Sequence, residues 1–159
     1  SYKNANEIIL NGKLLSTEIR KKDITSNVSA VSALLEVREF LVKIQRKLGN
    51  EIDCVIEGRD IGSVVFPNAD FKFFLTADLD VRSMRRKNEL KKLGEELTID
   101  EIKASIRRRD RIDSSREFSP LKRPEDSIEI DSSDLTIDEQ IEKIIKIIKN
   151  NKEGTSKYV

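Results

Sequence analysis

One stretch limits the possible folds more than any other part of the chain. It is an apolar run that ends in a Gly-bracketed pair of opposite charges and then continues to Pro67: Cys54-Val55-Ile56-Glu57-Gly58-Arg59-Asp60-Ile61-Gly62. β-Branched residues are frequent in 52–56, which is typical of a strand buried on both faces. The two glycines allow a sharp turn or a close approach to a ligand. Arg59 and Asp60 are therefore expected at the strand end, where open α/β sheets bind ligands; a structural salt bridge between them is the alternative.

Composition excludes several classes of protein. The 159 residues fit one domain, and 30 Lys and Arg nearly cancel 29 Asp and Glu. This balance argues against a general nucleic-acid or membrane-surface protein. No apolar run is long enough to span a bilayer, and the N-terminus has no signal-peptide pattern. A single cysteine excludes an internal disulfide and suits a reducing compartment, so we expect a cytoplasmic protein without membrane contact.

Histidine is absent from the sequence. Its absence removes the commonest general base, the Ser-His and Cys-His nucleophile systems and most zinc sites. No metal-ligand set is predicted. The chemistry must then rest on carboxylates, arginines, lysines and backbone groups, which favours positioning and charge neutralisation over covalent catalysis.

The first half of the chain predicts a hairpin, a helix and two strands. Asn11-Gly12 within 7–15 is the preferred turn of a two-residue hairpin. An apolar stripe from Val31 to Leu48 predicts a helix with Gly49 as its C-terminal cap. Arg38 lies level with that stripe, either as an arginine at the edge of the core or as part of a site. Strands are predicted over 52–56 and 71–75.

The second half predicts three further helices and a short strand. A helix over 78–93 precedes Gly94, and capping boxes at Thr98 and Thr136 begin two more helices. A strand is expected over 127–131. The last helix is expected to bury Ile137, Ile141, Ile144, Ile145 and Ile148, followed by a polar tail over 150–159. Strands separated by helices predict an α/β layer structure with a largely parallel sheet.

Positive charge gathers in one segment of this neutral chain. Residues 103–123 hold eight basic and three acidic side chains. Arg109, Asp113 and Arg116 are spaced to share one face of a helix. Two guanidiniums around a carboxylate suit a phosphorylated sugar, because arginine binds phosphate bidentately and a carboxylate accepts from a hydroxyl. A solvated lattice of surface salt bridges is the alternative.

Taken together, these segments resemble bacterial cytidylate kinase from about Asn6 to Lys149. The resemblance is carried by Ser29 nine residues before Arg38, by the Gly-Arg-Asp turn at 57–67, and by the run 109–116 with Ser119-Pro120-Leu121. It implies an α/β, P-loop nucleoside monophosphate kinase-like three-layer fold with a parallel sheet.

The resemblance also implies an activity: transfer of the terminal phosphate of ATP to CMP or dCMP, with Mg²⁺, in pyrimidine metabolism. It assigns roles to seven side chains: base reading to Ser29, Arg38 and Asp60, phosphate binding to Arg59 and Arg116, and sugar contact to Arg109 and Asp113. Arg109 and Arg116 would also neutralise charge on the transferring phosphoryl group. Phosphoryl transfer needs little covalent chemistry, so the missing histidine is no obstacle.

One departure from the family concerns the ATP side. No Gly-x-x-x-x-Gly-Lys-Ser/Thr sequence occurs in the 159 residues. We expect an N-terminally incomplete kinase that starts inside the CMP-binding lobe, binds CMP weakly and transfers no phosphate by itself. The expected organisation is a partial nucleotide-binding lobe (1–51), core strands and helix (52–93), a basic lid (94–123), and a C-terminal core strand, helix and tail (124–159), in a monomer.

Two other readings stay open at this point. The first is a non-catalytic module that binds CMP or an RNA end through Arg59, Arg109 and Arg116. The second is a nucleic-acid binder that uses the basic cluster between Arg107 and Arg123, which would show strongly salt-dependent binding. The neutral total charge and the few aromatic residues weigh against this second reading.

Overall fold

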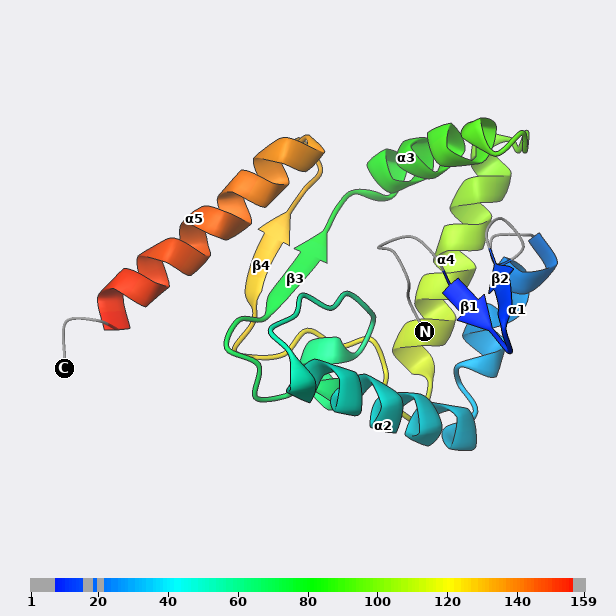
Figure 1. Cartoon of the computed structure of the whole chain (residues 1–159). Coiled ribbons are helices and arrows are strands. Elements are labelled where there is room, and N and C mark those ends of the chain that lie inside the picture. The colour runs from blue at the N-terminus through cyan, green and yellow to red at the C-terminus, as the bar shows by residue number, and fades with distance from the viewer. Residues whose placement is uncertain (1–7, 16–18, 20–21, 156–159) are drawn as a thin grey trace.

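The computed structural model describes residues 8–15, 19 and 22–155. Its elements follow the order β1 (Ile8–Leu10), β2 (Lys13–Leu15), α1 (Lys22–Val31), α2 (Leu35–Glu51), the π-helical turn η2 (Ile61–Val65), β3 (Phe73–Thr76), α3 (Leu79–Lys92), α4 (Ile99–Ser115), β4 (Ile128–Asp131) and α5 (Ile137–Thr155). Figure 1 shows α2 and α4 converging near η2, below the central strands, while α5 extends away from the other helices.

Strands β3 and β4 form a parallel pair, so the predicted α/β class with a parallel sheet is confirmed. Phe73 lies opposite Ile128, and Thr76 lies opposite Asp131. Ile130 on β4 is fully buried. Parallel strands are joined by long crossovers, and here the crossover contains α3 and α4 (Figure 1).

The N-terminal hairpin is confirmed for its described residues, 8–15, whereas Glu7 lies outside them. β1 and β2 pair antiparallel, with Leu10 opposite Lys13. Asn11 and Gly12 have φ angles of 50° and 80°. Two consecutive positive φ values define the type I′ turn, which Asn-Gly favours because both residues tolerate the left-handed region.

The boundaries of α3 and α4 follow local signals that the sequence predicts. Gly94 has a φ of 78°, its N–H donates to the Lys91 carbonyl, and the Glu95 N–H donates to the Leu90 carbonyl. These two bonds form a Schellman cap. At the start of α4, the Glu101 N–H donates to the Thr98 hydroxyl and the Glu101 carboxylate accepts from the Thr98 N–H, which completes the capping box.

Two predictions about the segment around α2 are wrong. The helical stripe is interrupted, because α1 ends at Val31 and α2 begins at Leu35. Gly49 does not end α2, which continues to Glu51. Its missing side chain instead admits the Phe66 ring, since a Cβ at Gly49 would stand 2.5 Å from Phe66 Cζ. Close packing of helix and aromatic ring explains this glycine better than capping does.

The predicted strand over 52–56 is not observed. These residues have no regular secondary structure, and Val55 is fully exposed. A strand that is buried on both faces needs neighbouring elements to cover it. In the described part of the chain, no strand pairs with residues 52–56. The glycine-bracketed turn nevertheless begins where it was expected, at Gly58.

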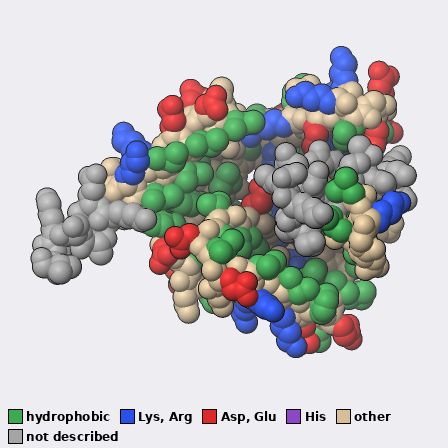
Figure 2. Space-filling model, in the orientation of Figure 1, with side chains coloured by type: hydrophobic (Ala, Val, Ile, Leu, Met, Phe, Trp, Pro, Cys, Tyr) green, Lys and Arg blue, Asp and Glu red, His purple; other side chains and the backbone are tan. Residues whose placement is uncertain are grey.

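The isoleucine stripe of α5 is also less buried than predicted. Ile137, Ile141 and Ile145 are exposed, because α5 packs only lightly against the remaining described elements. Figure 2 shows hydrophobic side chains gathered along α5 and the neighbouring strands. The helix continues to Thr155, so the predicted tail is helical up to that residue, and 156–159 lie outside the described residues. Among the described helices, none has the length and apolar character required to cross a bilayer.

Candidate functional site

Four elements bring charged side chains together: α2, the turn that leads into η2, α3, and α4 with the residue that follows it. We call these side chains the arginine–aspartate cluster; its members are Arg38, Arg59, Asp60, Arg82, Arg109, Asp110, Asp113 and Arg116. The six predicted site residues outside α1 all belong to it. The structure therefore joins residues that are up to 78 positions apart in the sequence.

The deepest contact in the cluster joins Arg38 to Asp60. The Arg38 guanidinium donates to Asp60 Oδ2, and the two residues are only 8% and 4% exposed. Arg38 is thus not a solvent-seeking residue at the edge of the core, which was the alternative interpretation. Its charge is held inside the protein by the carboxylate of the turn, and a buried pair of this kind requires good geometry to offset desolvation.

Arg59 points away from Asp60 and toward α4. Its Nε lies 3.2 Å from Asp113 Oδ2, and its Nη2 lies 3.9 Å from Asp110 Oδ1. The alternative of an Arg59–Asp60 salt bridge is therefore wrong. Asp110 also accepts from Arg82 Nη1 on α3 at 2.6 Å, so one carboxylate connects the turn with α3.

Arg116 occupies the junction between the turn and α4. Its Nη1 lies 3.8 Å from Asp113 Oδ1, and its Nη2 lies 3.9 Å from Asp60 Oδ1. Its Nε donates to the Ser119 carbonyl. Arg109, one turn earlier on α4, lies 3.7 Å from Asp113 and is more exposed. The predicted shared helix face of Arg109, Asp113 and Arg116 is confirmed, although α4 ends at Ser115.

Several buried polar atoms in the cluster have no hydrogen-bond partner among the described residues. They are Arg38 Nε, Arg82 Nε, Asp113 Oδ2 and Arg116 Nη2. Asp113 Oδ2 is close enough to Arg59 for an ion pair, but not in hydrogen-bond geometry. Unpaired buried polar atoms are costly and rare in folded proteins, and a bound ligand is one way to satisfy them.

Burial also disfavours the charges of two arginines. Desolvation, followed by the positive charge of Arg116, lowers the pKa of Arg38, while Asp113 acts in the opposite direction. The pKa of Arg116 is lowered mainly by desolvation, raised by Asp113 and lowered by Arg59. An added anion would stabilise both charged forms. Five arginines against three aspartates leave the cluster with two excess positive charges, close to the charge of a phosphate monoester.

Ser29 is the one predicted site residue that the structure does not bring to the cluster. It is half-buried on α1, where its backbone carbonyl accepts from the Ser32 hydroxyl. Its role stays a prediction. Conversely, no role was predicted for Asp110, although its position three residues before Asp113 places both on one helix face. Arg82 was also given no role, because it belongs to a run of basic residues.

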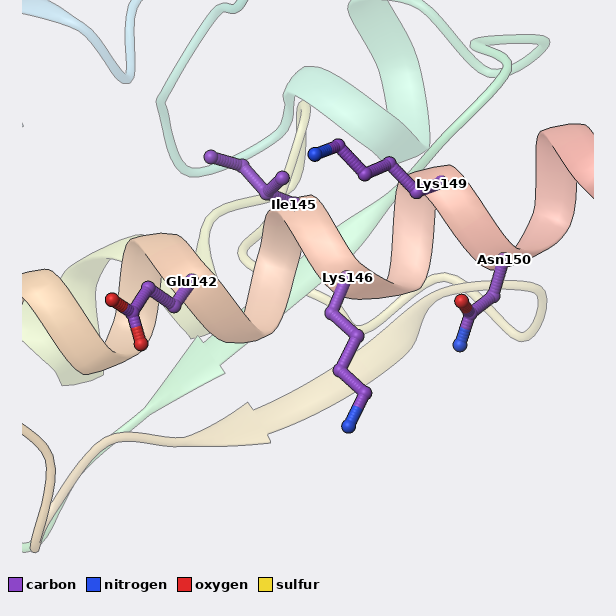
Figure 3. A pocket seen from close by; sticks show the side chains of 5 residues that line it. All are labelled: Glu142, Ile145, Lys146, Lys149 and Asn150. Atoms are coloured by element: carbon purple, nitrogen blue, oxygen red, sulfur yellow. The ribbon is translucent and has the colours of Figure 1, made fainter.

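Other parts of the described structure are weaker candidates for a functional site. No three His, Cys, Asp or Glu side chains within residues 8–15, 19 and 22–155 lie together as metal ligands. A hollow on α5 is lined by Glu142, Ile145, Lys146, Lys149 and Asn150 (Figure 3). All of these side chains come from one helix, so the hollow has no opposing wall. The buried, unsatisfied arginine–aspartate cluster is the better candidate site.

Comparison with known proteins identifies a family. The family model described as cytidylate kinase matches residues 1–150. The cytidylate kinase of Caldanaerobacter subterraneus subsp. tengcongensis is 48% identical over 147 residues, which are 92% of this chain and 66% of the relative. The cytidylate kinase of Clostridium tetani is 47% identical over 94% of this chain and 66% of its own length. That of Alkaliphilus oremlandii is 48% identical, with 89% and 65% covered. The chain thus spans about two thirds of the length of these relatives.

Proposed function

The chain belongs to the cytidylate kinase family, and on that premise we propose that the whole protein transfers the terminal phosphate of ATP to CMP or dCMP. The arginine–aspartate cluster would be the site of the phosphate acceptor. The observation that supports this most strongly is the buried Arg116 guanidinium, whose Nη2 has no hydrogen-bond partner among the described residues. With this substrate, the protein would act in pyrimidine metabolism in the cytoplasm.

Phosphate binding falls to Arg59 and Arg116. Both guanidiniums lie within 4 Å of Asp113, so this carboxylate holds them side by side. Arginine matches phosphate oxygens with a planar fork of donors, and charge-assisted bonds are the strong ones. Arg109 and Asp113 would contact the sugar, with the Asp113 carboxylate accepting from a hydroxyl. During transfer, Arg109 and Arg116 would stabilise the charge that develops on the phosphoryl group.

Base recognition falls to Arg38 and Asp60, together with Ser29. An ionised aspartate accepts from the N4 amino group of cytosine. Uracil carries a carbonyl oxygen at that position, which would face the Asp60 charge without a hydrogen. The hydrogen bond from Arg38 holds the Asp60 carboxylate in place. A site built to accept from the substrate's amino group rejects the analogue that lacks it, because the buried acceptor is left unpaired.

ATP and Mg²⁺ enter this proposal as the donor and its usual companion ion. Mg²⁺ is generally held by substrate phosphates and one or two carboxylates, where it neutralises their charge. Among the described residues no three His, Cys, Asp or Glu side chains lie together as metal ligands, and the 159 residues include no P-loop sequence. The roles proposed above therefore belong only to side chains of the acceptor site.

Calorimetric titration of the 159-residue chain with CMP, UMP and AMP tests the acceptor site. We expect weak binding of CMP in preference to UMP and AMP. Equal binding of all three nucleotides, or none, would overturn the assignment. A transfer assay with ATP and Mg²⁺ then separates the enzyme from a binding module: the 159-residue chain should bind CMP without turnover, and the whole protein should phosphorylate it. CMP binding by a whole protein without any turnover would favour the non-catalytic alternative.

A further inference from the structure

The turn that carries Asp60 is an unusual element with buried ends. Residues 61–65 form a single π-helical turn, in which the Asp60 carbonyl accepts from the N–H groups of Val64 and Val65 at 2.9 and 3.2 Å. Such turns are rare and occur frequently at functional sites. The last carbonyls of any helical turn lack partners within it. The position of Asp60 thus depends on what satisfies the far end of η2.

Arg46 satisfies that end. Its Nη2 donates to the Val64 carbonyl at 2.7 Å, and its Nε donates to the Val65 carbonyl at 2.9 Å. The planar fork of arginine spans two neighbouring carbonyls, and its charge lies at the negative end of the turn. Within the described structure, Arg46 forms no ion pair with a carboxylate. Its guanidinium donates hydrogen bonds to backbone carbonyls instead of forming a surface salt bridge.

Helix α2 therefore holds both ends of the turn. Arg38 binds the Asp60 carboxylate, and Arg46, eight residues or just over two turns later on α2, binds the carbonyls at the other end. Gly49 adds a third contact, because its missing side chain admits Phe66 directly after η2. Three contacts from α2 thus span the whole segment from Asp60 to Phe66.

We infer that Arg46 is a positioning residue for base recognition. It fixes η2 against α2, so that the Asp60 carboxylate keeps the orientation in which it distinguishes cytosine from uracil. Arg46 itself touches neither nucleotide nor reacting atoms in this inference, and it acts through Asp60. The inference rests on the proposed function, because Asp60 reads a base only if CMP binds at the arginine–aspartate cluster.

The test compares three variants of the 159-residue chain: Arg46→Met, Arg46→Lys and Lys47→Met. Lys47 is an exposed cation beside Arg46 on α2, so its replacement controls for lost charge. We expect Arg46→Met to reduce the ratio of CMP to UMP affinity roughly tenfold, the usual scale for losing charge-assisted hydrogen bonds. Arg46→Lys should restore the ratio in part, because lysine keeps the charge but donates to one point only. Lys47→Met should keep the wild-type ratio.

A second readout does not depend on the nucleotide. Hydrogen exchange at the Val64 and Val65 amides should become at least about tenfold faster in Arg46→Met, while exchange in β3 and β4 stays unchanged. Unchanged exchange at these two amides, or an unchanged CMP to UMP ratio in a folded variant, would overturn the positioning role. If Arg46→Met does not fold, Arg46→Lys is judged by the same two measurements. Failure of the wild-type chain to bind CMP would instead overturn the proposed function, with the exchange result still deciding whether Arg46 fixes η2.

Discussion

The carboxylate of Asp60 pairs with the guanidinium of Arg38, 22 positions away, and not with Arg59 beside it. These two neighbours of opposite charge therefore bind different helices: Asp60 pairs with a residue of α2, and Arg59 pairs with residues of α4. This division places on one short turn the two groups proposed to read the base and to bind the phosphate, the Asp60 carboxylate and the Arg59 guanidinium. Each of the two has its own buried partner.

The buried pair predicts a strong energetic coupling. Removal of one partner leaves the other charge buried without compensation, so Arg38→Met and Asp60→Asn should each lower the free energy of unfolding by about 3 kcal/mol. The double variant should lose at least about 1 kcal/mol less than the sum of the two losses. Urea denaturation of the four proteins measures this cycle. Losses that simply add would mean that the two side chains do not interact.

Arg116 should matter for the phosphate of CMP and not for its base. We expect Arg116→Gln to weaken CMP binding between about tenfold and a hundredfold, because charge-assisted hydrogen bonds to the phosphate are lost. Cytidine, which has no phosphate, should lose far less. Titration calorimetry with both ligands measures the difference. Arg111→Gln provides a matched control on the exposed side of α4, and an equal effect of both variants on CMP would contradict the assignment.

Gly49 should resist replacement although it lies within a helix. Alanine is a better helix former by about 1 kcal/mol, yet its Cβ would stand 2.5 Å from Phe66 Cζ. We expect Gly49→Ala to destabilise the protein by about 1 to 3 kcal/mol, as overpacking does. Asn50→Ala, at an exposed position of the same helix, should be neutral or slightly stabilising. Thermal unfolding compares the two variants, and a stabilised Gly49→Ala protein would show that Phe66 can move aside.

Local structure is predictable from this sequence wherever its cause is local. Asn11-Gly12 determines the hairpin turn, Gly94 determines the end of α3, and Thr98 with Glu101 determines the start of α4. The burial of Val55 and of the α5 isoleucines is different, since it depends on neighbours that the described residues do not provide. The partners of the charged side chains could not be predicted from the sequence either. Arg46 binds backbone carbonyls, which carry no sequence signature. Arg59 pairs with aspartates of α4, and Asp60 pairs with Arg38.

The second capping box predicts a dependence on pH. The Thr136 backbone N–H and hydroxyl both donate to the Glu139 carboxylate, and these bonds lower the pKa of Glu139. Because the pKa is lower in the folded state, the stabilisation is complete above the unfolded-state value of about 4.3 and is lost as pH falls through the folded value. Carboxyl ¹³C NMR titration should show the pKa of Glu139 rising in Thr136→Ala. An unchanged pKa would mean that the Thr136 hydroxyl does not bind the Glu139 carboxylate in solution.

The most direct test of the central claim is a crystal structure of the chain with CMP bound. We predict that the phosphate lies within hydrogen-bonding distance of Arg59 and Arg116, and that the cytosine amino group faces Asp60 beside Arg38. Arg116 Nη2, which has no hydrogen-bond partner among the described residues, should then donate to a phosphate oxygen. A phosphate bound instead to the exposed arginines 107 and 108, or a nucleotide seated on α5, would contradict the assignment of the arginine–aspartate cluster as the acceptor site.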